Sequence, residues 1–300
     1  MRSAADRLTA TLAFGLMGLF KLLPADAALA LGDRLARVAG PLTRRHKLVR
    51  YNLSMAFPEK SAREIEALAR DSWAGMGRLA VEYVYLDTLL DFDIGRPGEG
   101  RIDVAGAERL VDFVANPRPT IFFASHSGFF EIVPMVAAAY GVHPTILYRP
   151  PNNPYMAARI DSFRRGRLAR LVPSHAGSSL TLARTLSAGG SIAVLVDQKF
   201  PTGIATTFFG HPVHTNPLVP KLARQFGCDV VPIHCERLAG NRYRITVEPP
   251  LSLPKDPAGK VDADAVAQML NDKVEEWVRQ APGQWLWYHD RWNIKRQIGL

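Results

Sequence analysis

Cysteine is scarce in this chain of 300 residues, which contains only Cys228 and Cys235 and no CxxC pair. Two cysteines at this spacing argue against a disulfide scaffold and against a cysteine-ligated zinc site. We therefore expect no metal centre. Free thiols fit a reducing compartment, so the sequence favours exposure to the cytosol.

Long apolar runs are also missing. The most apolar helical stretch, Leu8 to Leu23, has 16 residues and ends at Pro24, whereas a helix needs about 20 to span a hydrocarbon core. Ala25-Asp26-Ala27 resembles the small-residue cleavage site of a secretory signal. Against cleavage, the chain continues as an amphipathic pattern that indicates a second helix, ALALGDRLARVAG.

Acidic residues are fewer than basic ones, and the formal net charge is +9 with a pI of about 9.8. The positive electrostatic field of such a protein favours anionic partners. The chain has no basic run interleaved with aromatic residues, no zinc-finger pattern and no RNP-like pattern, so a nucleic-acid partner is not expected. Anionic lipid or an acidic carrier protein is the better candidate.

A basic cluster follows the two N-terminal helical patterns and consists of Arg44, Arg45, His46, Lys47 and Arg50. An apolar helix, an amphipathic helix and a basic cluster in this order indicate an anchor that lies in, or dips into, an anionic leaflet. The alternative is that 8–23 is a buried core helix. We predict a membrane-anchoring helical segment over 1–43 and one domain over 44–300.

The rest of the chain has the sequence pattern of an α/β protein. Ser61 and Glu64 form a capping-box pattern that predicts a helix running to about Leu90. From Ile102 onward, short apolar runs alternate with helical patterns, and the chain closes with a predicted helix over 262–280 and an aromatic tail, QWLWYHDRW. We find no internal repeat and no low-complexity linker. The pattern predicts a mixed central sheet covered by helices on both faces.

His126 follows the predicted strand TIFFAS, and Glu131 comes five residues later, across a turn made by Ser127 and Gly128. Open α/β sheets place their ligand crevices at the carboxyl ends of their strands. A histidine there suits general-base chemistry near neutral pH, and a carboxylate that accepts its N–H fixes its tautomer. Backbone N–H groups near Gly128 are candidate donors to an oxyanion. The alternative is that both side chains only cap the helix.

The chain has no GxSxG nucleophile elbow. The histidine would then activate a hydroxyl of the substrate and not one of the protein.

Around this pair stand further boxes in order: YNLSMAFPE (51–59), LYRPPNNP (147–154), FRRGR (163–167), LVDQ (195–198), TTFFGHPVHTNPLVPKLARQFGCDVVP (206–232) and PGQWLWYHDRW (282–292). Together they strongly resemble the lauroyl/myristoyl acyltransferases of bacterial lipid A biosynthesis, in the glycerolipid-acyltransferase-like superfamily. The resemblance runs from about Arg44 to the end of the chain.

The resemblance implies an O-acyltransferase without an acyl-enzyme intermediate. The donor would be acyl carrier protein or acyl-CoA, with no other cofactor, and the acceptor a hydroxyl of a lipid A precursor. The enzyme would work at the cytoplasmic face of the bacterial inner membrane. In this likeness His126 corresponds to the base and Glu131 to its orienting carboxylate, and the substrate-binding positions are Arg149, Arg164 and Asp197.

Two other functions stay open. The first is an acyltransferase that acts on a different glycolipid or aminolipid. The second is a non-catalytic membrane-binding protein on the same fold. The tail departs from the family pattern, because Asp290 follows His289 where a second basic residue is more common. Otherwise we interpret the tail as C-terminal packing.

Overall fold

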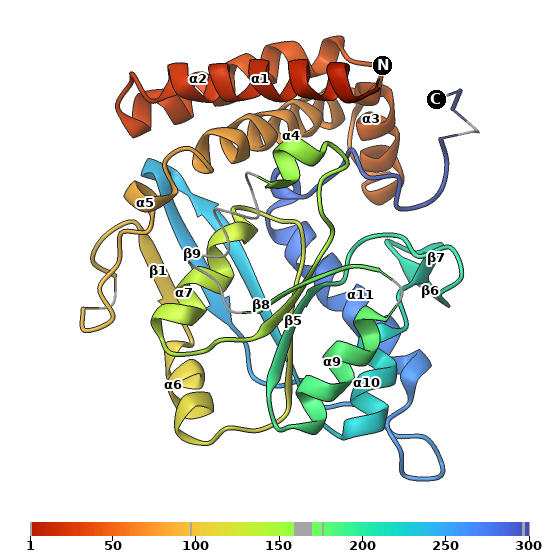
Figure 1. Cartoon of the computed structure of the whole chain (residues 1–300). Coiled ribbons are helices and arrows are strands. Elements are labelled where there is room, and N and C mark those ends of the chain that lie inside the picture. The colour runs from red at the N-terminus through yellow and green to blue at the C-terminus, as the bar shows by residue number, and fades with distance from the viewer. Residues whose placement is uncertain (1, 97, 159–169, 176, 296–297, 300) are drawn as a thin grey trace.

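A computed structural model describes residues 2–96, 98–158, 170–175, 177–295 and 298–299 of the chain (Figure 1). Its main helices are α1 Arg2–Phe20, α2 Ala25–Ala39, α3 Arg45–Ala56, α4 Ala62–Glu82, α5 Leu86–Leu89, α6 Ala107–Ala115, α7 Val133–Ala139, α9 Ser178–Ser187, α10 Leu218–Phe226 and α11 Ala263–Gln280. Its strands are β1 Ile102–Ala105, β2 Thr120–Ala124, β3 Thr145–Tyr148, β4 Leu171–Pro173, β5 Ser191–Leu195, β6 Ile204–Phe208, β7 His211–Thr215, β8 Asp229–Leu238 and β9 Arg242–Val247.

Seven strands form the central sheet in the order β1-β9-β8-β2-β5-β3-β4. All neighbouring pairs are parallel except β8 and β9, which pair antiparallel. The predicted α/β class with a mixed sheet is therefore confirmed. Strands β6 and β7 form a separate antiparallel hairpin, which the sequence reading did not identify.

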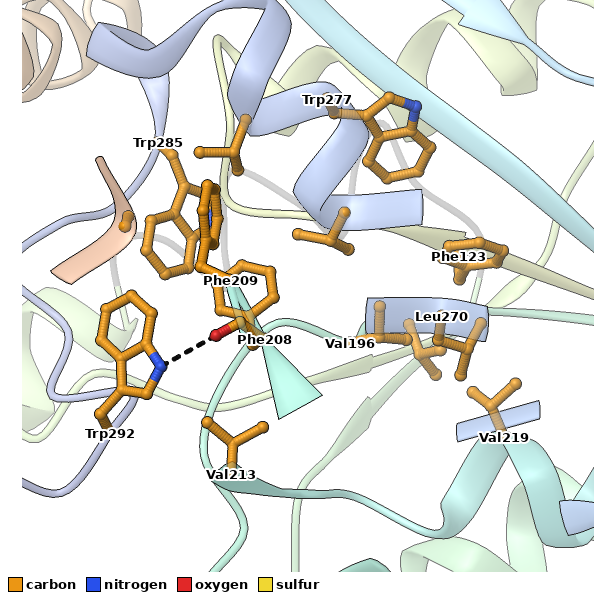
Figure 2. Close-up of a cluster of buried hydrophobic side chains, with 14 of the residues drawn as sticks. Phe123, Val196, Phe208, Phe209, Val213, Val219, Leu270, Trp277, Trp285 and Trp292 are labelled. Carbon is orange, nitrogen blue, oxygen red and sulfur yellow. Dashed lines mark hydrogen bonds between the residues drawn. The ribbon is translucent and has the colours of Figure 1, made fainter. Parts of the chain in front are cut away.

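Two hydrophobic cores cover the two faces of the sheet, because successive side chains of a strand point to opposite faces. On β2, Phe123 joins the core formed with α9, α10 and α11, whereas Phe122 joins the core formed with α6 and α7. Figure 2 shows part of the first core, in which Trp285 and Trp292 surround Phe208. The indole N–H of Trp292 donates to the carbonyl of Phe208 at 3.2 Å. The aromatic tail is thus built into this core.

The N-terminal helices lie at one end of the molecule, where α2 packs along α4 (Figure 1). The two helices approach so closely that a Cβ added at Gly77 would lie 2.2 Å from the carbonyl oxygen of Gly32. On α1, leucines at positions 8, 12, 16 and 19 are exposed, and on α2 so are Leu31, Leu35 and Val38. Of the helices in the described part of the chain, none combines the length and apolarity needed to cross a membrane.

The long helix predicted to reach about Leu90 ends earlier, at Glu82. The carboxylate of Glu82 is fully buried and accepts two hydrogen bonds from Arg237, each 2.7 Å long, and one from the hydroxyl of Tyr243. The chain then turns, and the hydroxyl of Tyr85 donates to the carbonyl of Leu23 at 2.7 Å. These tertiary contacts stop a helical pattern that the sequence alone would have continued.

Candidate functional site

The register of two neighbouring strands brings His126 and Asp197 together. Parallel strands β2 and β5 pair with Ala124 opposite Leu195. His126 comes two residues after Ala124, and Asp197 comes two residues after Leu195. Since both strands end at the same edge of the sheet, both side chains reach the crevice that the strand ends predict.

Asp197 holds His126 through two hydrogen bonds. Nδ1 of His126 lies 2.7 Å from Oδ1 of Asp197, and the backbone N–H of His126 donates to Oδ2 at 2.8 Å. The indole N–H of Trp285 also donates to Oδ2, at 2.8 Å. Asp197 is only 3% exposed, and these donors compensate for the loss of water around its carboxylate.

The environment shifts the pKa values of both partners. Burial by itself raises the pKa of Asp197, but the charge of His126 and the hydrogen bonds to the carboxylate outweigh it and lower the pKa to about 2. Burial by itself lowers the pKa of His126, but Asp197, through charge and hydrogen bonding, and the charge of Glu131 raise it above its usual value. An ionised Asp197 at neutral pH makes Nδ1 the donor, which leaves the lone pair of the neutral imidazole on Nε2. This is the tautomer that a general base needs.

The second ring nitrogen faces a cavity. Nε2 of His126 lies 3.3 Å from the side-chain nitrogen of Gln198. Both residues line a cavity of about 580 Å³, whose wall is mostly apolar and lies along the face of the sheet that α7 covers. His126 therefore stands between a buried carboxylate and an apolar cavity large enough for a lipid tail.

Glu131 lies in a short 3-10 turn, Phe130–Ile132, lines the same cavity and is nearly buried. The sequence reading gave it the position on the imidazole N–H. In the structure Asp197 occupies that position on Nδ1, and Glu131 raises the pKa of His126 through its charge.

The three residues expected to bind substrate have different locations. Arg149 is exposed and lines the cavity beside the prolines at 150 and 151. Asp197 lies behind His126 and bonds to protein donors, so its place is that of a positioning group. Arg164 lies outside the described residues. No cluster of three potential metal ligands is present among the residues that the structure describes.

Of the backbone N–H groups near Gly128 that were expected to bind an oxyanion, the one of Gly128 itself already has a partner in the protein. The backbone N–H of Gly128 donates to the carbonyl of Gln284 at 3.1 Å. Its φ is +59°, and an added Cβ would lie 2.2 Å from the carbonyl oxygen of Cys235. Gly128 is therefore needed for a close backbone approach, and its own N–H is not available to a substrate.

The C-terminal tail forms part of the site, which the sequence reading missed. The indole N–H of Trp285 donates to Asp197, and the backbone of Trp285 forms an isolated antiparallel β-bridge with Ser127. His289 accepts a hydrogen bond from the backbone N–H of Lys199 at 2.9 Å, and burial lowers the pKa of this histidine to about 4, so it is neutral at pH 7. The tail therefore braces the loops that follow β2 and β5. The only sequence signal was an unusual density of tryptophan, which does not specify a partner.

Comparison with known proteins gives a match along nearly the whole chain. A family model described as "Bacterial lipid A biosynthesis acyltransferase" matches residues 3–294. The lipid A biosynthesis lauroyltransferase of Escherichia coli K12 is 27% identical over 294 residues, covering 95% of this chain and 91% of the relative. The lipid A biosynthesis myristoyltransferase of the same organism is 26% identical over 261 residues, covering 85% and 77%. A phosphatidylinositol mannoside acyltransferase of Mycolicibacterium smegmatis is 24% identical over 263 residues, covering 86% and 81%.

Proposed function

This chain belongs to the bacterial lipid A biosynthesis acyltransferase family, and we propose that it transfers a fatty acyl chain from a carrier thioester to a hydroxyl of a lipid A precursor. Acyl carrier protein or coenzyme A would carry the thioester. The observation that carries the proposal is the placement of His126, which has Nδ1 on buried Asp197 and Nε2 at an apolar cavity.

The geometry supports a direct transfer. Nε2 of His126 takes the proton of the acceptor hydroxyl while the hydroxyl oxygen attacks the thioester carbonyl carbon. The carbon–sulfur bond then breaks, and the imidazolium returns its proton to the leaving thiolate, which gives one ester and one thiol. Asp197 stabilises the imidazolium, and the charge of Glu131 favours it further. We assign Arg149, with its planar donors, to a phosphate of donor or acceptor.

The test is product formation by the purified protein. Lauroyl-acyl carrier protein and lauroyl-CoA are supplied in separate reactions with a tetra-acylated lipid A precursor, and products are weighed by mass spectrometry. We expect an increase by one acyl group and release of one thiol per ester formed. Thiol release at the same rate without acceptor, and no acylated lipid in either reaction, would overturn the proposal and leave a thioesterase.

A different acceptor is the second candidate, because one relative is a phosphatidylinositol mannoside acyltransferase. Lipid profiles of cells with and without the protein distinguish the two. A lipid A species short of one acyl chain supports the first proposal, and a missing glycolipid or aminolipid ester supports the second.

We also propose that the enzyme works on the cytoplasmic face of the inner membrane, with α1 and α2 lying in the lipid surface. The exposed leucines of α1 recur every three or four residues and so form one apolar stripe. The amide of Asn153 donates to the backbone carbonyl of Asp6 at 2.7 Å, which ties α1 to the chain that follows the cavity wall at 149–152. A lipid acceptor would then meet the cavity close to the membrane.

Replacement of Leu12 and Leu16 by aspartate should release the protein from vesicles that contain phosphatidylglycerol. Two apolar side chains would leave the lipid and two charges would have to enter it, so we expect at least a tenfold loss of binding in flotation assays. Val111→Asp, on the exposed surface of α6, is the matched control and should bind as the unaltered protein does. Equal flotation of all three proteins would contradict the proposed orientation.

A further inference from the structure

The floor of the cavity is a trough set by side-chain size. On β2, Ala124 and Phe122 lie on the same face as His126, because alternate residues of a strand share a face. In the sheet register Ala124 lies opposite Leu195, and Phe122 lies opposite Ala193. Each of these two cross-strand pairs thus combines an alanine with a large side chain. Ala124 and Ala193 stand diagonally across the two strands, and the space left by their small side chains leads from His126 toward the start of β2 and β5.

Helix α7 forms the roof of this trough. Val133, Pro134 and Ala137 line the cavity from the helix, at the spacing that places residues on one helical face. The helix begins just after Glu131 and runs away from the catalytic end. Val142, which follows the helix, and Leu110 of α6 also line the cavity, and both are almost completely buried. Val142 lies three residues before Thr145, which pairs with Ile192 near the start of β5, and α6 contacts Phe122 through Phe113. Val142 and Leu110 therefore lie toward the end of the cavity far from His126.

We propose that Ala137, Val142 and Leu110 limit the length of the acyl chain and select donors of about 10 to 12 carbons. This inference rests on the proposed acyl transfer at His126. From His126 to Phe122 the strand rises by four residues, which is about 13 Å. A zigzag of carbon–carbon bonds of about 1.5 Å advances about 1.3 Å per bond, so roughly ten bonds fit this depth.

Beyond that depth the interior is closed. The core around Val142 and Leu110 is packed with buried apolar side chains from α7, β8 and β9. A longer chain would have to displace them, and close-packed interiors resist added methylene groups. Shorter chains would leave the far end of the trough unfilled and lose the corresponding apolar contact.

Binding of neutral 1-alkanols of 6 to 14 carbons tests the depth without any catalysis. Affinity, measured by titration calorimetry, should rise about fourfold for each added methylene group until the trough is full, and then stop rising. The chain length at which affinity stops rising is the break. Ala137→Phe should move this break to an alcohol shorter by two to four carbons, and Val142→Ala should move it to a longer one. Ala139→Phe places the same side chain at an exposed position of the same helix and should leave the break unchanged.

Product analysis is the second measurement. With an equimolar pool of C8 to C16 acyl donors, Ala137→Phe should raise the ratio of C8 to C12 product by about fifteenfold, the effect of losing about two buried methylene groups. A folded Ala137→Phe variant with an unchanged break in alkanol affinity would overturn the inference, as would affinity that climbs steadily through 14 carbons. Failure of acyl transfer with any donor would instead count against the proposed function, since the alkanol series does not depend on it.

Discussion

His126→Ala is expected to form acylated lipid roughly 10³-fold more slowly than the unaltered enzyme, the range found when a general base is removed. The loss follows from position, because Nε2 of His126 is the ring nitrogen at the cavity while Nδ1 is bonded to Asp197. Steady-state turnover measured by mass spectrometry gives the ratio directly. The same variant should respond to added imidazole, which can enter the vacated space and restore part of the rate.

Two further variants separate loss of the base from loss of the fold. Alanine leaves the buried carboxylate of Asp197 without the hydrogen bond from Nδ1 of His126, which is destabilising. His126→Asn keeps an amide that can donate to Asp197 but cannot accept a proton, so it should fold and remain inactive. His214→Ala removes an exposed histidine of β7 and should keep full activity. A folded His126→Asn variant with more than a tenth of normal turnover would contradict the proposed base.

Asp197→Asn should lower turnover by about 10³-fold or more and move the pH profile toward acid. An amide can donate to Nδ1 and so trap the wrong tautomer, a change that is very costly in histidine-dependent catalysis. In the unaltered enzyme Asp197 helps raise the pKa of His126. The base works only when neutral, so the rate falls as the pH drops through this raised pKa. Without the carboxylate, burial becomes the dominant influence and lowers the pKa, so the acid limb should shift to lower pH.

Trp285→Phe is the matched variant for this pH experiment. It keeps the carboxylate and most of the aromatic packing but removes the indole donor to Oδ2. We expect a smaller loss of turnover, about tenfold, and an acid limb close to that of the unaltered enzyme. If Asp197→Asn and Trp285→Phe had the same pH profile and the same rate, Asp197 would be only a structural residue.

What the sequence could predict differs between the two carboxylates of the site, Glu131 and Asp197. Glu131 was paired with His126 because it follows closely along the chain, and its charge does act on the imidazole. Asp197 is 71 residues away, and its distance from His126 depends on which strands are neighbours. The family resemblance gave Asp197 only as a substrate-binding position. It did not predict His126 as the partner of Asp197, because the register of β2 with β5 is a tertiary property.

By itself, the sequence determined the α/β class, the position of His126 at the end of a strand and, through its ordered motifs, the family. These follow from local patterns: alternation along strands, helical periodicity and turn residues. Only the tertiary structure decided that Asp197 bonds to Nδ1, that the N–H of Gly128 is taken by Gln284, and that Trp285 bonds to Asp197. Each of these contacts joins segments far apart in the chain, and the folding of the sheet and the docking of the C-terminal tail bring them together.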